Sequence, residues 1–194
     1  MAKNFGSLAF TDEVKLLQEK YGSRKHYERM QMRTVIDGLT DFEVEFISHR
    51  DSFYMASLGE NGYPYIQHRG GPKGFVKVID SKTIGFMDFS GNRQFITMGN
   101  LATHNKVSLI MMDYPARARL KIYAKAEIIE LNDRQDLFNM LNLNDDYPAK
   151  PERMLLLHIE AYDWNCPQHI SPRYTIQELE EAGVSGGLKE LKKK

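Results

Sequence analysis

The sequence contains little cysteine and no excess of charge of either sign. One cysteine among 194 residues cannot form a disulfide within the chain, which favours a reducing, cytoplasmic setting. The 26 basic and 26 acidic residues cancel, so no overall field would attract nucleic acid or an acidic membrane surface. The N-terminal residues lack the charged and apolar parts of a secretion signal, and no apolar run approaches membrane-spanning length. We therefore expect a cytoplasmic protein that binds neither nucleic acid nor membrane.

Several common catalytic and nucleotide-binding motifs are missing as well. The sequence has no GxGxxG after a strand, no Walker loop and no GxSxG turn, which argues against NAD-binding domains, nucleotidases and hydrolases. Cys166 and His169 make only half a metal site, and the other histidines are scattered without ligand spacing, so we predict no metal. Cys166 also lacks an evident third catalytic partner and is followed by Pro167, which favours a structural thiol over a nucleophile.

Short strand-forming segments separated by turns dominate the chain from residue 51 onward. Asn61-Gly62 suits a hairpin turn, because this pair tolerates positive φ. Residues 65–69 and 75–79 flank a Gly-Gly-Pro turn and are predicted to pair as a second hairpin. The spacing predicts a mainly β (α+β) protein, an antiparallel barrel or sandwich with flanking helices. The predicted strands are residues 51–58, 65–69, 75–79, 83–89, 106–113, 119–131 and 154–164.

Helical segments flank the predicted sheet. Thr11 and Thr175 are suitable N-caps for a helix near each end of the chain, and Thr40-Asp41-Phe42-Glu43 supplies the capping residues of a helix that should pack on the sheet. Residues 1–10 have little pattern and are expected to form a loosely held arm, whereas residues 23–32 suit either a helical turn or a charged loop. The predicted helices are residues 14–21, 40–47, 94–105, 133–141 and 176–182.

Two segments combine strand-forming residues with glycines and a guanidinium group. The first is Gln67–Gly74 and the second is Phe89–Gln94. Glycine lets backbone approach a ligand closely, and arginine, an amide and backbone N–H groups together suit a phosphate. Either segment alone fits an ordinary turn with a solvated arginine. The occurrence of both in succession favours one binding surface for a flat, anionic ligand.

At these residues the chain resembles the pyridoxamine 5'-phosphate oxidase-related, FMN-binding split-barrel family. The resemblance covers most of residues 40–175, which we expect to be an FMN-binding split-barrel domain. An N-terminal arm and helix (1–39) would precede it, and a C-terminal helix with a basic, frayed tail (176–194) would follow, in one domain overall. The order and spacing of the shared motifs make the resemblance specific. The motifs are residues 67–71, 91–94, 99–101, 113–115, 119–121 and 163–170.

The resemblance implies a split β-barrel that forms a homodimer with FMN at the subunit interface. The flavin would carry electrons in a two-electron redox reaction on a small molecule, so no side-chain nucleophile is required. The family's residues for the substrate phosphate have no counterpart in matching positions, so neither the substrate nor a catalytic side chain is predicted. Two alternatives stay open. One is the same barrel with deazaflavin F420 or haem, and the other is a non-catalytic module that binds or senses flavin.

The resemblance assigns the FMN phosphate to Arg93, with Asn92 and Gln94 beside it. The family's oxidases have Ser-Arg-Lys where this chain has Asn-Arg-Gln, so one cation is missing. Lys73 or Arg69 would make up the shortfall. Otherwise the phosphate is bound more weakly or the flavin is a different one.

The remaining predicted contacts surround the flavin ring. His68 or Arg69 would stabilise negative charge at the pyrimidine edge, and only one can do so because neighbouring strand residues face opposite ways. A hydrogen-bonded barrel histidine is an equal alternative for His68. Trp164 and Arg173 resemble, in residue type and approximate spacing, the tryptophan and arginine near the family's C-terminus that help to hold FMN, although a core anchor is the more common role of a lone tryptophan. Met87 and Asp88 would line the ring through backbone atoms. The predicted cofactor-binding set is Gln67, His68, Arg69, Gly70, Lys73, Met87, Asp88, Asn92, Arg93, Gln94, Asn100, Trp164 and Arg173.

Overall fold

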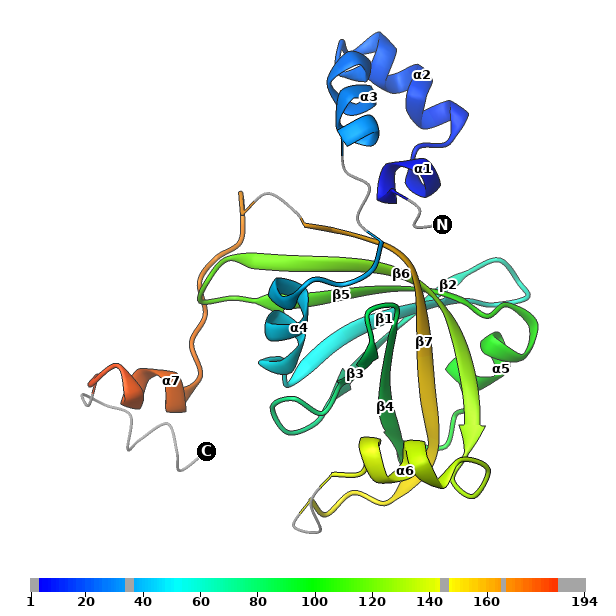
Figure 1. Ribbon diagram of the computed structural model, residues 1–194, viewed down its shortest axis with the longest axis vertical. Coiled ribbons are helices and arrows are strands. Elements are labelled where there is room, and N and C mark those ends of the chain that lie inside the picture. Colours follow the sequence, from blue (N-terminus) through cyan, green and yellow to red (C-terminus); the bar gives the residue numbers. More distant parts are fainter. Residues whose placement is uncertain (1–3, 34–36, 144–146, 165–166, 185–194) are drawn as a thin grey trace.

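A computed structural model describes residues 4–33, 37–143, 147–164 and 167–184 of the protein (Figure 1). Seven strands form one antiparallel sheet in the order β2-β1-β5-β6-β7-β4-β3. The sheet curls around a common interior, and its edge strands β2 and β3 do not pair, so the barrel is split. The strands are β1 (Ser52–Leu58), β2 (Pro64–Gly70), β3 (Lys77–Asp80), β4 (Thr83–Phe89), β5 (Lys106–Asp113), β6 (Ala118–Glu130) and β7 (Pro151–Trp164).

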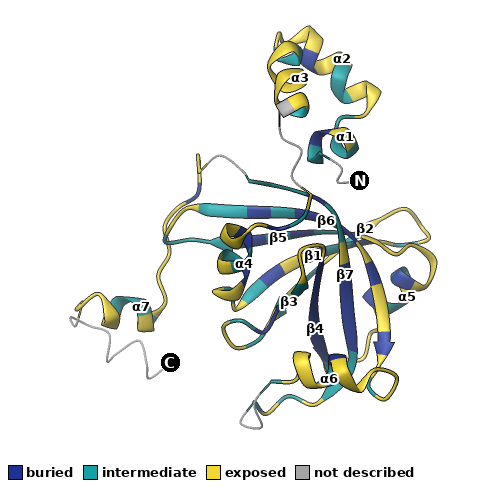
Figure 2. Cartoon of the chain, in the orientation of Figure 1, coloured by how far each residue is buried: buried dark blue, intermediate teal, exposed yellow. Residues whose placement is uncertain are grey.

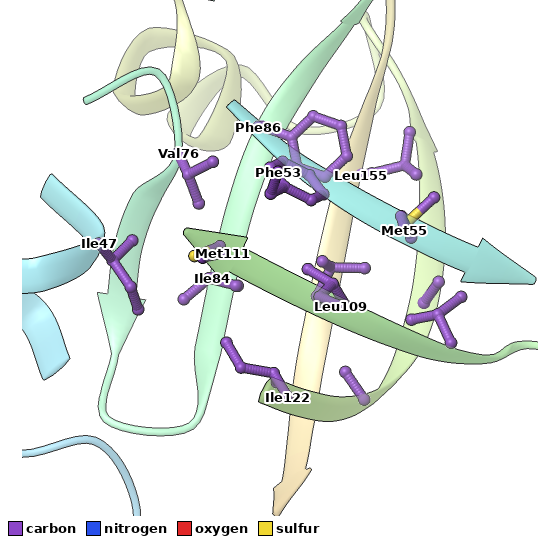
Figure 3. Close-up of a cluster of buried hydrophobic side chains, with 14 of the residues drawn as sticks. Ile47, Phe53, Met55, Val76, Ile84, Phe86, Leu109, Met111, Ile122 and Leu155 are labelled. Carbon is purple, nitrogen blue, oxygen red and sulfur yellow. The ribbon is translucent and has the colours of Figure 1, made fainter. Parts of the chain in front are cut away.

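The barrel interior is filled by large apolar side chains from strands on opposite sides of the curl. The ring of Phe53 on β1 lies 5.3 Å from that of Phe86 on β4 and 5.8 Å from that of Phe75. Figure 3 shows Phe53, Phe86 and Leu155 of β7 pointing into the same space. Side-chain packing therefore joins strands that share no backbone hydrogen bonds.

Most of the predicted strands are confirmed. The structure has β4 and β5 with the predicted bounds, while β1, β6 and β7 differ from their predictions only at the ends. The predicted turn at Asn61-Gly62 joins β1 to β2, and Gly62 has a φ of 80°. Strong local signals, namely runs of strand-forming residues between turns and Asn-Gly at one turn, account for these successes.

The predicted hairpin between residues 65–69 and 75–79 is wrong. Strand β2 pairs only with β1, and β3 pairs only with β4, so these two strands form the opposite edges of the sheet. The intervening glycines instead hold the loop against the segment that precedes β1. Gly71 N donates to the Asp51 carbonyl and Gly74 N to the Arg50 carbonyl, each at 2.9 Å. Phe75 is buried in the core beyond this loop, and β3 begins two residues later.

Four helices lie against the sheet. Helix α4 begins with a capping box, in which Glu43 accepts hydrogen bonds from Thr40, as the sequence predicts. Helix α5 packs on β1 and β2, and α6 lies across the end of β4 (Figure 1). Short α1 contacts β7. The bounds are α1 (Phe5–Ala9), α4 (Asp41–Ser48), α5 (Ile96–Thr103) and α6 (Gln135–Leu141).

Three further helices lie away from the barrel, and Figure 2 shows their surfaces to be largely exposed. They are α2 (Asp12–Lys20), α3 (Arg24–Arg33) and α7 (Ile176–Glu181), the last capped by Thr175 as predicted. Residues 5–9 form α1 instead of part of a loose arm, because Phe5 packs on Tyr123 with ring centroids 4.6 Å apart. The predictions for Cys166 and for the tail at 189–194 lie outside the described residues.

The helices that the structure describes include none that is both long enough and apolar enough to cross a membrane.

Candidate functional site

Asp88 connects the two segments that the sequence singles out. It lies near the end of β4 and is only 5% exposed. Its Oδ1 forms an ion pair with Nη1 of Arg69 on β2, and its Oδ2 lies 3.3 Å from Nη1 of Arg153 on β7. One carboxylate thus holds two guanidinium groups and ties the edge strand β2 to β4 and β7, near the opposite edge of the sheet.

Arg93 and Arg153 both contact the ring of Phe95. The Cζ atom of Arg93 lies 5.9 Å from the centroid of the Phe95 ring, and that of Arg153 lies 5.6 Å from it. The two guanidinium carbons are therefore no farther apart than the sum of these distances. We call Arg69, Arg93, Arg153, Asp88 and Phe95 the arginine cluster.

The loop between β4 and α5 has a constrained backbone. Arg93 and Phe95 both adopt left-handed φ values, 58° and 55°, which non-glycine residues rarely do. Asn92 Oδ1 accepts a hydrogen bond from Gln94 N at 3.1 Å, forming a local turn that fixes the loop. Asn92, Arg93 and Gln94 are all exposed. The loop therefore presents the Arg93 side chain at the surface instead of folding it into the core.

Helix α5 begins at the arginine cluster. Its N-cap residue is Phe95, which supplies no side-chain cap hydrogen bond to the first turn. Buried Thr97 in that turn donates from Oγ1 to Oε1 of Gln67 at 2.8 Å and so fixes the helix start against β2. The positive end of the helix dipole and its backbone N–H groups thus lie beside exposed arginine side chains.

The arginine cluster carries more positive than negative charge. Its three guanidinium groups are opposed by Asp88 and by Glu152, whose Oε2 lies 2.9 Å from Nη2 of Arg153. The buried Nε of Arg69 has no hydrogen-bond acceptor among the described residues. A buried donor without an acceptor is costly. The arrangement is suited to binding an anion.

Several predicted site residues lie away from this cluster. His68 is exposed on the opposite face of β2 from Arg69, with its ring 5.4 Å from that of Tyr54. The predicted alternation of His68 and Arg69 is thus confirmed. Lys73 is exposed in the loop after Gly70, and the Met87 side chain is buried in a second apolar cluster beneath α6.

Asn100 and Arg173 also make contacts elsewhere. Asn100 Nδ2 donates to Oγ of Ser57 at 3.0 Å, which ties α5 to β1. Arg173 is exposed, and its Cζ lies 4.9 Å from the ring centroid of Tyr114, in the turn between β5 and β6. Within one chain, neither side chain contacts the arginine cluster through any interaction found among the described residues.

Trp164 is a core anchor within this chain. It ends β7, whereas Arg153 stands near the start of the same strand. Its ring packs against Phe46 at 4.7 Å, and its Nε1 donates to Oε1 of Glu43 at 2.7 Å. Tyr162 donates from its hydroxyl to Oε2 of the same carboxylate at 3.2 Å.

The surroundings of Glu43 shift two pKa values. Burial alone would raise the pKa of Glu43, but hydrogen bonds from Thr40, Trp164 and Tyr162 outweigh it and hold the pKa below its ordinary value. Burial, together with the nearby Glu43 carboxylate, raises the pKa of Tyr162 to about 12. This network fastens α4 to β7 and is a structural feature of the barrel.

Sequence reasoning missed Arg153, Glu152 and Phe95. Arg153 is separated from Asp88 by 65 positions, so no local pattern connects the two. A signal was present, because Glu152 and Arg153 directly precede the apolar run that begins at Met154. Charged residues at the start of a buried strand often lie at the rim of the barrel, where ligands bind.

A cavity of about 350 Å³ opens on another part of the sheet. It lies where β1, β5 and β6 meet α1, and it is mostly apolar, with Lys106 and Glu160 as its charged residues. Among the described residues, no group of three or more His, Cys, Asp or Glu side chains is placed to hold a metal ion. The lining residues are Leu8, Ala56, Ser57, Leu58, Pro64, Lys106, Val107, Ser108, Tyr123, Ala124 and Glu160.

The fold and the arginine cluster define a split β-barrel with a positively charged site beside an edge strand. The sequence model of the pyridoxamine 5'-phosphate oxidase family matches residues 39–164, which is more than half of the chain. This protein belongs to that family. The match includes the whole arginine cluster and leaves out the helices α1 to α3.

Solved structures with a similar fold include HupZ of Group A Streptococcus, at 14% identity and a TM-score of 0.52, over 70% of this chain and 100% of the HupZ chain. A putative pyridoxamine 5'-phosphate oxidase from Lactobacillus delbrueckii is 19% identical, with a TM-score of 0.49 over 66% of this chain and 95% of its own. An FMN-binding protein from Syntrophomonas wolfei is 13% identical, with a TM-score of 0.46 over 76% of this chain and 97% of its own. At these identities, the HupZ match supports the fold alone. Among curated proteins, none matches this chain.

Proposed function

We propose that this protein binds FMN and acts as an FMN-dependent oxidoreductase on a small molecule. The observation that carries the proposal is the arginine cluster, whose excess positive charge lies at the start of α5 within the family-matched residues. The phosphate of FMN has nearly two negative charges near neutral pH, and guanidinium groups with backbone N–H donors are its usual partners in proteins.

The residues present fit the phosphate of FMN. Arg93 is exposed on a turn that fixes its backbone, so it can meet the phosphate without leaving a buried partner. Gln67 and Thr97 hold the start of α5 in place, and Asp88 holds the Arg69 guanidinium. When bound, FMN would supply two-electron redox chemistry, and the protein would bind, orient and shield it. No nucleophilic side chain is required.

An exposed apolar stripe supports the proposal of a homodimer with FMN at the interface. Tyr54, Leu58 and Ile66 are 41%, 42% and 65% exposed. The register pairs Ala56 with Ile66, and Leu58 with Pro64, so these side chains share the outer face of β1 and β2. Contiguous apolar side chains on a surface commonly mark an interface.

A second copy would also account for the family-like residues outside the cluster. Trp164 and Arg173 lie at the other end of β7 and beside the β5–β6 turn, away from Arg93. In one chain they cannot reach the flavin that Arg93 would hold. In the proposed dimer they would approach the flavin of the partner subunit.

The decisive experiment is to release the chromophore of the purified protein by denaturation and to identify it by mass. We expect FMN; F420 or haem instead would replace the proposed cofactor. A colourless protein that stays empty in excess FMN would refute the proposal. Stopped-flow reduction by NADH or NADPH, followed by oxygen, then tests catalysis, because a bound flavin that neither step turns over indicates a flavin-binding module.

A further inference from the structure

The FMN phosphate carries nearly two negative charges, and Arg93 supplies one positive charge. The family's oxidases have a lysine after the phosphate arginine, and this chain has the neutral Gln94 there. We propose that Arg153 supplies the second phosphate-binding cation and that Glu152 occupies its guanidinium until the phosphate arrives. This inference rests on the proposed FMN binding, and it assigns two residues that no family motif identifies.

The position of Arg153 carries the first half of the inference. Arg153 and Arg93 both lie against the ring of Phe95, with Cζ atoms 5.6 and 5.9 Å from its centroid. Asp88 fixes the Arg153 guanidinium through Nη1 at 3.3 Å. The Arg153 side chain is 16% exposed, so it is held in place and still reaches the surface. A guanidinium restrained in this way loses little further conformational freedom on binding.

The two cations that the sequence suggested are placed less well for this role. Lys73 lies in the loop after β2, not in the β4–α5 loop. Its neighbour Gly74 donates its backbone N–H to the carbonyl of Arg50, which precedes β1. Arg69 has its Nη1 paired with buried Asp88 and its Cζ 6.0 Å from the Phe86 ring in the barrel interior. Arg69 therefore faces inward, whereas Arg153 and Arg93 contact the same aromatic ring.

The contact and exposure of Glu152 support the second half of the inference, that Glu152 occupies the Arg153 guanidinium until the phosphate binds. Its Oε2 accepts from Nη2 of Arg153 at 2.9 Å, and its side chain is 27% exposed, against 7% for Asp88. Of the two carboxylates on Arg153, Glu152 is thus the one that can turn into water without leaving a buried charge unpaired. A phosphate oxygen would then replace it as the acceptor for Nη2. Glu152 consequently competes with the phosphate.

The test compares FMN with riboflavin, which lacks the phosphate. Apoprotein is titrated with each flavin, and binding is followed by quenching of flavin fluorescence. Arg153→Gln should weaken FMN binding roughly 10- to 100-fold, the usual range for a charge-assisted hydrogen bond, and leave riboflavin binding unchanged. Arg153→Lys should retain part of the FMN preference. Arg50→Gln is the matched control, because Arg50 is 14% exposed and pairs with Asp113, and it should not change the FMN-to-riboflavin ratio.

Glu152→Gln should act in the opposite direction and tighten FMN binding several-fold. A double-mutant cycle separates competition from a general charge effect: the gain should disappear in the Arg153→Gln background. Equal loss of both flavins in Arg153→Gln, or a Glu152→Gln gain that persists without Arg153, would overturn the inference. If Arg153→Gln fails to fold, the Glu152→Gln variant is a sufficient test by itself. Weaker or unchanged FMN binding by that variant would overturn the inference. Wild-type protein that binds neither flavin would instead refute the proposed function itself.

Discussion

Asp88 is the most informative residue to change, because one buried carboxylate neutralises two guanidinium groups. Asp88→Asn keeps the shape of the side chain and removes its charge, so Arg69 and Arg153 lose their common partner. Removing one member of a buried ion pair costs about 3 to 5 kcal/mol. The Arg69 and Arg153 side chains are 12% and 16% exposed, and water therefore reaches them in part. We expect the free energy of unfolding to fall by about 2 to 3 kcal/mol.

Urea unfolding of the apoprotein measures this change. Far-UV circular dichroism reports the whole barrel, and fluorescence of the single tryptophan, Trp164, reports the packing of α4 on β7, away from Asp88. Coincident transitions would show that unfolding is two-state, so that the free energies can be compared.

The matched control is Asp113→Asn. The Asp113 side chain is 18% exposed and pairs with one guanidinium, that of Arg50, at 2.7 Å. Because only one cation is left without its partner, we expect a loss of about 1 kcal/mol. If Asp88→Asn costs no more than Asp113→Asn, the idea that Asp88 holds the arginine cluster together is wrong.

Three further predictions address the site, the Glu43 network and the loop after β2. Arg93→Ala should weaken FMN retention by about 1.5 to 3 kcal/mol while changing the free energy of unfolding by less than about 0.5 kcal/mol, since Arg93 is exposed; equal losses of both would argue against a phosphate role. Because the folded-state pKa of Glu43 lies below its ordinary value of 4.5, ionised Glu43 stabilises the folded protein at pH values above 4.5. This stabilisation is lost as the pH falls through the folded-state pKa, so the unfolding curves of wild type and Glu43→Gln should converge in acid. Gly74→Ala should cost about 2 to 3 kcal/mol, because its φ is +75° and a Cβ would lie 2.9 Å from the Ser48 carbonyl oxygen. Gly62→Ala, with φ +80° and open space around the Cβ position, should cost only about 1 kcal/mol, and similar losses at both glycines would contradict the close approach to Ser48.

The sequence by itself determined the features that depend on neighbours along the chain. Alternation along β2 placed Arg69 and His68 on opposite faces, Asn61-Gly62 specified the turn after β1, and Thr40 with Glu43 specified the start of α4. Each of these depends on backbone geometry over a few residues, which local side chains control directly.

Only the tertiary structure decided which distant residues meet. The sequence suggested that residues 75–79 pair with β2, yet β2 and β3 form opposite edges of the sheet, and Phe75, which lies between them along the chain, is buried in the core. The contact of Asp88 with Arg153 likewise follows from the pairing of β4 with β7, which closes a long loop. Such pairings depend on how all seven strands fill one interior at once, and no short stretch of sequence encodes that balance.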